Sequence, residues 1–200
     1  DLKVANNKVD CYGLCVKILV DRLLSFTLDN NYYQFDLLNG LSAFQYLSEG
    51  KKLIDEGILD LMPEETAYPE VIHKAMHYSL LAGGKRLRSV LVIAASEAVG
   101  GDRKAVLPFA VAAELIHTYT LIHDDLPALD NDDLRRGKPT NHKVFGEAVA
   151  ILAGDALLTE AFILMTRAAG MESIPPECIL KATHEMSTAL GSKGMIGGQV

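Results

Sequence analysis

The chain has 200 residues, of which 49% are hydrophobic and 22% are charged, so it can bury a substantial core and is neither a disordered tail nor a disulfide-stapled miniprotein. Its formal net charge of −7 argues against a nucleic-acid partner, because binding a polyanion normally requires a basic surface. The three cysteines, Cys11, Cys15 and Cys178, have no partners at metal-binding spacing. Such cysteine usage favours a reducing compartment, and we expect a cytoplasmic protein.

The first 40 residues differ from the remainder. Residues 1–40 are rich in asparagine and carry no chemistry that can be assigned, so we interpret them as an N-terminal extension. From residue 41 to residue 200, apolar residues recur at helical spacing with little strand-like alternation, which predicts one all-α domain. Its expected joints are marked by glycine and proline: Pro63, Pro69, Gly100–Gly101, Pro108, Gly137–Pro139, Gly170 and Pro175–Pro176. No uninterrupted apolar stretch reaches the roughly 18 residues of a membrane span, so none is expected.

A basic segment, GGKRLR, occupies residues 83–88. Lys85 and Arg88 are three residues apart, which would put both on one face of a helix, with Arg86 beside them. Glycines directly before a helix let the backbone approach a ligand, and the helix N-terminus adds amide donors. We interpret the segment as an anion-binding element.

The next segment, residues 110–125, is predicted to be a continuous helix. Asp124 follows His117 by seven residues and Thr120 by four, so the three share one face. Two turns separate His117 from Asp124, about 10 Å, so one pocket could contact both. Pro127 should then break the helix between Asp125 and Asp130 and could bring Asp130 back toward Asp124.

An acidic cluster follows, in which five aspartates fall within ten residues and two arginines come directly after them. These residues are Asp124, Asp125, Asp130, Asp132, Asp133, Arg135 and Arg136. Carboxylates this close repel one another unless a cation neutralises them. Their hard oxygen ligands suit Mg²⁺ or Ca²⁺, and an EF-hand is excluded because Arg135 and Asn141 stand where its glycine and glutamate are required. Mg²⁺, which uses one or two carboxylates together with substrate phosphates, fits best.

Two separate cationic groups, GGKRLR and the Arg135–Arg136 pair, indicate two phosphorylated substrates. His123 and His142 have no second ligand at metal-binding spacing, so we predict structural roles for both.

Together, GGKRLR, the block ELIHTYTLIHDDLPALDNDDLRRGKPTNHKVFGEAVAILAGDALL and the final GGQ resemble the polyprenyl synthetase family over residues 44–200. The resemblance implies an isoprenoid-synthase helical bundle around a central cavity, cut short at its C-terminal side, and a homodimer. It also implies that Asp124 and Asp130 hold Mg²⁺ bridging an allylic diphosphate, with Asp125 supporting and Arg135 contacting the same group. The implied ligands of isopentenyl diphosphate are Lys85, Arg88, His117 and Arg136, and Gln199 would lie near the allylic substrate.

The reaction implied is the condensation of isopentenyl diphosphate with an allylic diphosphate. In the family, product length depends on the positions of Tyr119 and Thr120, and the bulky Tyr119 resembles the short-chain farnesyl type. A geranylgeranyl product remains an alternative, because other positions of the cavity wall also count.

Two departures from the family pattern bear on activity. The family's second aspartate-rich motif falls beyond residue 200, so these 200 residues on their own are expected to be inactive. Ser89 stands where a proline is common, a change that we expect to be tolerated.

A non-catalytic regulatory subunit of a heterodimeric synthase is a rival interpretation, although such subunits commonly lack intact aspartate motifs. A terpene cyclase is a second rival, and it would not need Lys85, Arg88 and His117.

Overall fold

The computed structural model describes residues 43–168 and 174–199, and the predicted extension, Gly170, Cys11 and Cys15 lie outside these residues. The described part is mainly helical, which confirms the all-α prediction. Its elements, in chain order, are α2 (Ala43–Leu61), α3 (Glu70–Leu80), α4 (Leu87–Ala98), α5 (Arg103–Asp124), β1 (Leu134–Arg135), β2 (Lys138–Pro139), α6 (Asn141–Phe145), α7 (Glu147–Arg167), α8 (Pro176–Leu190) and the 3₁₀ turn η2 (Ile196–Gln199).

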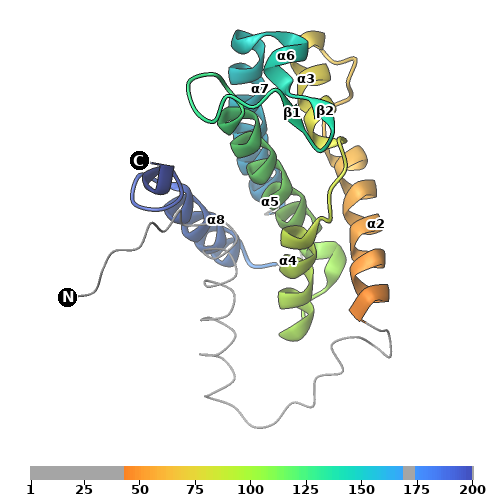
Figure 1. Ribbon diagram of the computed structural model, residues 1–200. Coiled ribbons are helices and arrows are strands. Elements are labelled where there is room, and N and C mark those ends of the chain that lie inside the picture. The colour runs from red at the N-terminus through yellow and green to blue at the C-terminus, as the bar shows by residue number, and fades with distance from the viewer. Residues whose placement is uncertain (1–42, 169–173, 200) are drawn as a thin grey trace, which may run out of the picture.

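The core lies around α5, which packs most extensively against α7 and then against α4. Figure 1 shows α5 in the middle of the molecule, with α2 on one side and α8 on the other. Burial follows from composition: residues 110–116 of α5 are apolar except for Glu114, and every one of them is buried. Small residues on α7, among them Ala150, Ala153 and Ala161, are completely buried and let the two long helices approach closely.

Both α5 and α7 are long and apolar enough, by length and composition, to cross a membrane. In their most apolar windows, 67% of the α5 residues and 44% of the α7 residues are buried inside the protein. Core helices of soluble proteins share this property, so it is weak evidence for a span.

Most of the expected helix joints agree with the structure, but Pro108 was predicted wrongly. It lies inside α5, in the second turn of the helix, and is buried. In the second turn the proline costs the helix one hydrogen bond, the one that an amide at residue 108 would donate to the Lys104 carbonyl oxygen.

A two-stranded hairpin between α5 and α6 was not predicted. Leu134 pairs with Pro139 and Arg135 with Lys138 in antiparallel register. Arg136 and Gly137 form the turn with φ angles of 55° and 77°, as a two-residue hairpin of this kind requires. The Tyr78 hydroxyl on α3 donates to the Pro139 carbonyl oxygen at 2.8 Å, which fixes the hairpin to the bundle.

Candidate active site

The acidic end of α5 is shaped by a tight turn, as Pro127 predicted. The helix ends at Asp124, and the amide of Asp130 returns to donate to the Asp124 carbonyl oxygen at 2.8 Å. Asn131 adopts a left-handed conformation, with φ of 53°, and its amide donates to the Leu126 carbonyl oxygen at 3.1 Å. The turn therefore brings the first and third aspartates of the motif next to each other.

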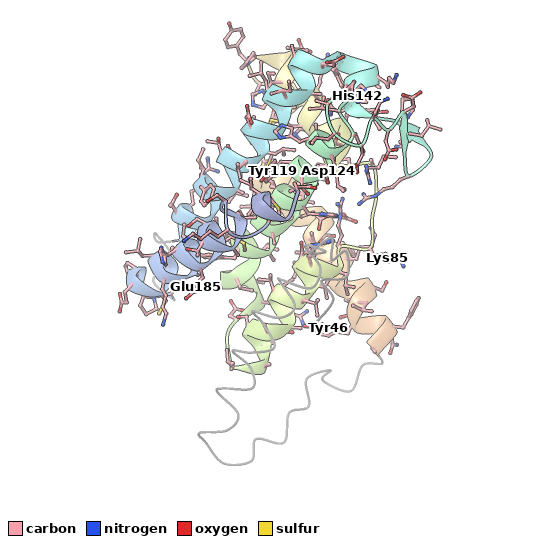
Figure 2. The ribbon with its side chains drawn as sticks, turned by 60° about the vertical axis from the view of Figure 1, so that its left-hand side comes forward. Tyr46, Lys85, Tyr119, Asp124, His142 and Glu185 are labelled. Carbon is pink, nitrogen blue, oxygen red and sulfur yellow. The ribbon has the colours of Figure 1, made fainter. Side chains whose placement is uncertain are left out.

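Asp124 is partly buried on the open side of this turn. Burial raises the pKa of its carboxyl above the usual range, and the neighbouring Asp130 raises it further. The Gln199 side-chain amide donates to Asp124 Oδ1 at 2.6 Å, so η2 reaches the acidic turn from a distant part of the chain. Figure 2 shows Asp124 beside Tyr119 near the middle of the molecule, where this C-terminal segment crosses α5. The structure thus brings Gln199 to Asp124, beside the turn that carries Asp130.

Asp125, by contrast, is buried, with only 3% of its surface exposed. Arg135 binds it through two nitrogens, with Nε at 2.8 Å and Nη2 at 2.5 Å from Oδ1. The same guanidinium lies 3.6 Å from Asp132. Asp125 thus anchors Arg135 on the hairpin, and much of the guanidinium predicted to contact a diphosphate is already bonded to protein.

The donor set around Asp124 fits Mg²⁺. Nowhere in residues 43–168 and 174–199 do three Asp, Glu, His or Cys side chains converge to enclose a metal without other ligands. Two carboxylates held close enough to raise a pKa nevertheless call for a cation. Mg²⁺ characteristically takes one or two carboxylates and completes its shell with water and phosphate oxygens.

The basic segment differs from its predicted form. Helix α4 begins at Leu87, so Lys85 lies in the preceding loop and does not share a helical face with Arg88. Gly83, Gly84 and Arg86 all have positive φ angles, and this irregular backbone delays the helix. The Lys85 side chain is exposed on that loop, and Figure 2 shows it below and to the right of Asp124.

Arg88 and His117 meet between α4 and α5, with Arg88 Nη1 3.3 Å from His117 Nε2. Burial, and after it the charge of Arg88, lower the pKa of His117 to about 4. The ring is therefore neutral at physiological pH, and its Nε2 can accept a hydrogen bond from Arg88.

Arg136 extends from the hairpin turn over Gly84. A Cβ added at Gly84 would stand 2.9 Å from Arg136 Nη1, so only glycine allows the guanidinium to lie there. Burial lowers the pKa of Arg136, as do the nearby charges of Arg86, Arg135 and Arg88. The hairpin turn therefore lies against the GGKRLR loop, and the charges of Arg88 and Arg136 both act on His117. Lys85 lies on the same loop.

Arg86 was interpreted as part of the anion-binding element, and the structure corrects this. Its side chain is buried, and Nη1 donates to Glu114 Oε1 at 2.7 Å. Glu114 was missed, although a lone acid inside the apolar run AVAAELI signals a buried partner. Ser89, expected to be a tolerated change, donates its hydroxyl to Glu114 Oε2 at 3.2 Å.

The remaining predicted residues line or support the same region. Tyr119 is 7% exposed and packs edge-on against His123, with the ring centroids 5.6 Å apart. The Thr120 hydroxyl donates to the His117 carbonyl oxygen within α5.

Two further histidines bond to protein groups. His123 Nε2 lies 3.0 Å from the Ile151 carbonyl oxygen, and Nδ1 of buried His142 lies 3.2 Å from Thr140 Oγ1. Both histidines have structural surroundings, as predicted.

A small cavity of about 30 Å³ lies beneath the hairpin, on the Asp125 side of α5. It is lined in part by Thr118, Asp125, Arg135 and Asn141. Asn141 donates to the Ala75 carbonyl oxygen and to Ser79 Oγ, both at 2.8 Å, and so ties α6 to α3. Asp124 does not line this cavity, so it is not the predicted central cavity, which stays a prediction.

Comparison with known proteins identifies related sequences and folds. Residues 69–199 match the family model described as polyprenyl synthetase. A farnesyl diphosphate synthase from Geobacillus stearothermophilus is 54% identical over 159 residues, which cover 80% of this chain and 53% of that protein. The heterodimeric geranylgeranyl pyrophosphate synthase large subunit 1 of Arabidopsis thaliana is 52% identical over 80% of this chain and 43% of its own length.

Solved structures agree with these sequence matches. An FPP/GFPP synthase from Zymomonas mobilis is 40% identical with a TM-score of 0.73, over 78% of this chain and 55% of that one. A geranyltransferase from Legionella pneumophila gives a TM-score of 0.74 at 38% identity, over 78% of this chain and 54% of that one. The chain therefore spans about half the length of the relatives that it matches.

Proposed function

The chain belongs to the polyprenyl synthetase family, and on that premise we propose that its complete protein is a short-chain trans-prenyl diphosphate synthase. The substrates would be isopentenyl diphosphate and an allylic diphosphate. One observation carries the proposal: a pair of adjacent carboxylates, Asp124 and Asp130, shares one end of α5 with a separate cationic surface formed by two segments. Two anionic groups of different substrates could be bound there, one through a metal and one directly.

Each protein group has a distinct part in this reaction. Asp124 and Asp130 would hold Mg²⁺, which, when bound, supplies positive charge to stabilise the departing diphosphate. Gln199 orients the Asp124 carboxylate, and Asp125 fixes Arg135 beside it. The bond between the allylic carbon and its diphosphate oxygen breaks, the double bond of isopentenyl diphosphate forms the new carbon–carbon bond, and loss of a proton restores a double bond.

The second substrate would be bound by Lys85, Arg88, His117 and Arg136. His117 serves here as a neutral group, so it orients Arg88 without adding charge. Arg136 lies near three other arginines, Arg86, Arg135 and Arg88, whose charges lower its pKa, so a bound anion would relieve the repulsion among them. No side-chain nucleophile is needed, because the carbon–carbon bond forms between the two substrates.

For product length we propose a farnesyl product, with Tyr119 closing the site. Its ring is buried one turn or more below Asp124 and is held against His123. A growing prenyl chain that extends along α5 would meet the Tyr119 ring. A geranylgeranyl product is longer and would require this side chain to move aside. Relatives of both kinds are similar to this chain.

The test is a product assay with the complete protein, labelled isopentenyl diphosphate, dimethylallyl or geranyl diphosphate, and magnesium. Chromatography of the dephosphorylated alcohols should give farnesol. Geranylgeraniol would keep the chemistry and refute the role of Tyr119. A folded complete protein that makes no prenyl product would refute the synthase and favour the regulatory subunit.

Assembly and compartment are separate proposals. We propose a homodimer, supported by exposed apolar side chains on α7, namely Ile151, Leu152 and Ile163. Light scattering that gives a monomer would contradict it. Cysteine usage, including the exposed thiol of Cys178, supports a reducing compartment, which we propose to be the cytoplasm. Cell fractionation tests this placement.

A further inference from the structure

The loop that carries Lys85 is held by a buried charge network centred on Arg86. Arg86 is 3% exposed and Glu114 is 2% exposed. Each polar part of the guanidinium bonds to a different element: Nε to Asp55 of α2 at 2.9 Å, Nη1 to Glu114 of α5 at 2.7 Å, and Nη2 to the Leu80 carbonyl oxygen at the end of α3, also at 2.7 Å. One side chain therefore joins three helices to the start of α4.

The backbone at Arg86 is as unusual as its surroundings. It has φ of 52° and ψ of 24°, a left-handed conformation that is unfavourable for a non-glycine residue. The residue persists there because its three side-chain bonds hold it. Strain of this kind is commonly kept where it positions a functional segment.

The network lies directly behind the proposed site for isopentenyl diphosphate. Glu114 is three residues before His117 on α5 and so is on the same side of that helix. Arg86 lies between Lys85 and Arg88, whose Nη1 is 3.3 Å from His117 Nε2. Fixing Arg86 on Glu114 therefore sets the position of the basic loop along α5.

Ser89 completes the network. Its hydroxyl donates to Glu114 Oε2, so both carboxylate oxygens have a donor. The first helical hydrogen bond of α4 runs from the Val90 amide to the Arg86 carbonyl oxygen, so helix formation does not require the amide of Ser89. The backbone would accept proline at this position, but proline could not supply the hydroxyl.

We propose that Arg86 and Glu114, supported by Asp55 and Ser89, are positioning residues that align Lys85 and Arg88 with His117 for the diphosphate of isopentenyl diphosphate. The proposal rests on the proposed function and assigns these residues no contact with substrate. The allylic side of the site, at Asp124, belongs to a different turn and should be affected much less.

The test compares Glu114→Gln and Arg86→Lys with a matched control, Glu97→Gln, in the complete protein. Glu97 also joins α4 to α5 through an ion pair, with Arg103 at 2.6 Å, but at the far end of the helix pair. Glutamine keeps the shape of Glu114 and removes its charge, and lysine keeps the charge of Arg86 but loses the planar set of donors. Ser89→Ala is a milder variant in case the first two fold poorly.

In steady-state assays, Glu114→Gln and Arg86→Lys should raise the KM for isopentenyl diphosphate by about 10-fold, equivalent to about 1.4 kcal/mol. The KM for the allylic diphosphate should change by less than about 2-fold, and Ser89→Ala should shift in the same direction by a smaller factor. Glu97→Gln should leave both constants within about 2-fold of wild type. A folded variant that raises both KM values equally, or neither, overturns the proposal, because a merely structural network predicts no such split.

A second measurement does not depend on turnover. Hydrogen–deuterium exchange in the peptide covering residues 82–88 should become faster in Glu114→Gln and stay at the wild-type rate in Glu97→Gln. Unchanged exchange in Glu114→Gln would refute the positioning role even if the wild-type protein is an active synthase. Wild-type protein that makes no prenyl product would instead refute the proposed function, and the exchange result would still decide whether the network holds the loop.

Discussion

Two charged regions of this protein contrast sharply. Around Arg86, opposite charges are buried and each is bonded, so nothing remains for a ligand. At the acidic turn, Asp124 and Asp130 carry like charges close together, with Asp124 partly buried and Asp130 exposed. The contrast shows that the number of charges does not mark a functional site. A better indicator of a functional site is a group of like charges without opposite charges beside them, because a bound ligand or ion is needed to neutralise them.

The largest effect on stability should come from removing one charge of the buried Arg86–Glu114 pair. Arg86→Met leaves Glu114 buried without its cation, and the loss of such a partner typically costs about 3–5 kcal/mol. We expect a large fall in the urea midpoint and in Tm of the complete protein. The double variant Arg86→Met with Glu114→Leu removes both charges and should recover part of that loss. A single variant as stable as wild type would contradict the contrast.

The next largest effect should come from the acidic turn, where removing Asp124 should lower enzymatic activity. Asp124→Ala should lower the rate of product formation at least about 100-fold, because the variant removes half of the carboxylate pair that would hold Mg²⁺. Stability should hardly change, since the substitution relieves repulsion from Asp130. Circular dichroism and the product assay measure the two effects. Asp60→Ala, at an exposed position of α2, is the matched control and should be active.

Substitution of Asp125 tests whether the two adjacent residues Asp124 and Asp125 have different roles. Asp125→Asn removes the charge that anchors Arg135, and we expect a loss of about 2 kcal/mol in unfolding free energy. Activity should fall less than in Asp124→Ala, because the asparagine side chain would still offer Arg135 one oxygen. The urea midpoint and the rate, measured on the same samples, show whether the order is as expected. Equal loss of activity in both variants would mean that Asp125 also binds the metal.

The smallest effect is a pH dependence from His117. Its pKa is lowered to about 4, by burial first and then by Arg88, Arg136 and Arg135, against the opposing charge of Glu114. Because the unfolded chain binds the proton more readily, this contribution is fully present above about pH 6.5 and is lost as the pH falls toward 4. We expect a loss of about 1–2 kcal/mol across that window, measured by urea unfolding. His117→Gln should flatten this part of the pH profile.

Much of the acidic end of α5 was predictable because its signals are local. The seven-residue spacing of His117 and Asp124 fixes their common face, and Pro127 fixes the end of the helix. The closeness of Asp124 and Asp130 follows from that short turn, and the structure shows it directly. The contact between Gln199 and Asp124 joins distant segments, and only the family resemblance indicated it.

The basic segment was harder to predict. Lys85 and Arg88 have helical spacing, yet the positive φ angles of Gly83, Gly84 and Arg86 delay the start of α4 to Leu87. Arg86 looks like its neighbours in sequence, and its inward direction depends on Glu114, which is 28 residues away. The hairpin was missed because each of its strands has only two residues, too short for any alternating pattern.

The turn after Asp124 also restricts the number of residues that can separate the aspartate pair from the third aspartate. Two closures, from the Asp130 amide to Asp124 and from the left-handed Asn131 to Leu126, can both form only if four residues separate the aspartate pair from the third aspartate. Removing two of those residues would shorten the loop that each hydrogen bond closes, so the two closures could not both form as they do here. A protein with a shorter spacer must therefore build its acidic turn on a different backbone path, so spacer length constrains where the third carboxylate stands and cannot vary freely.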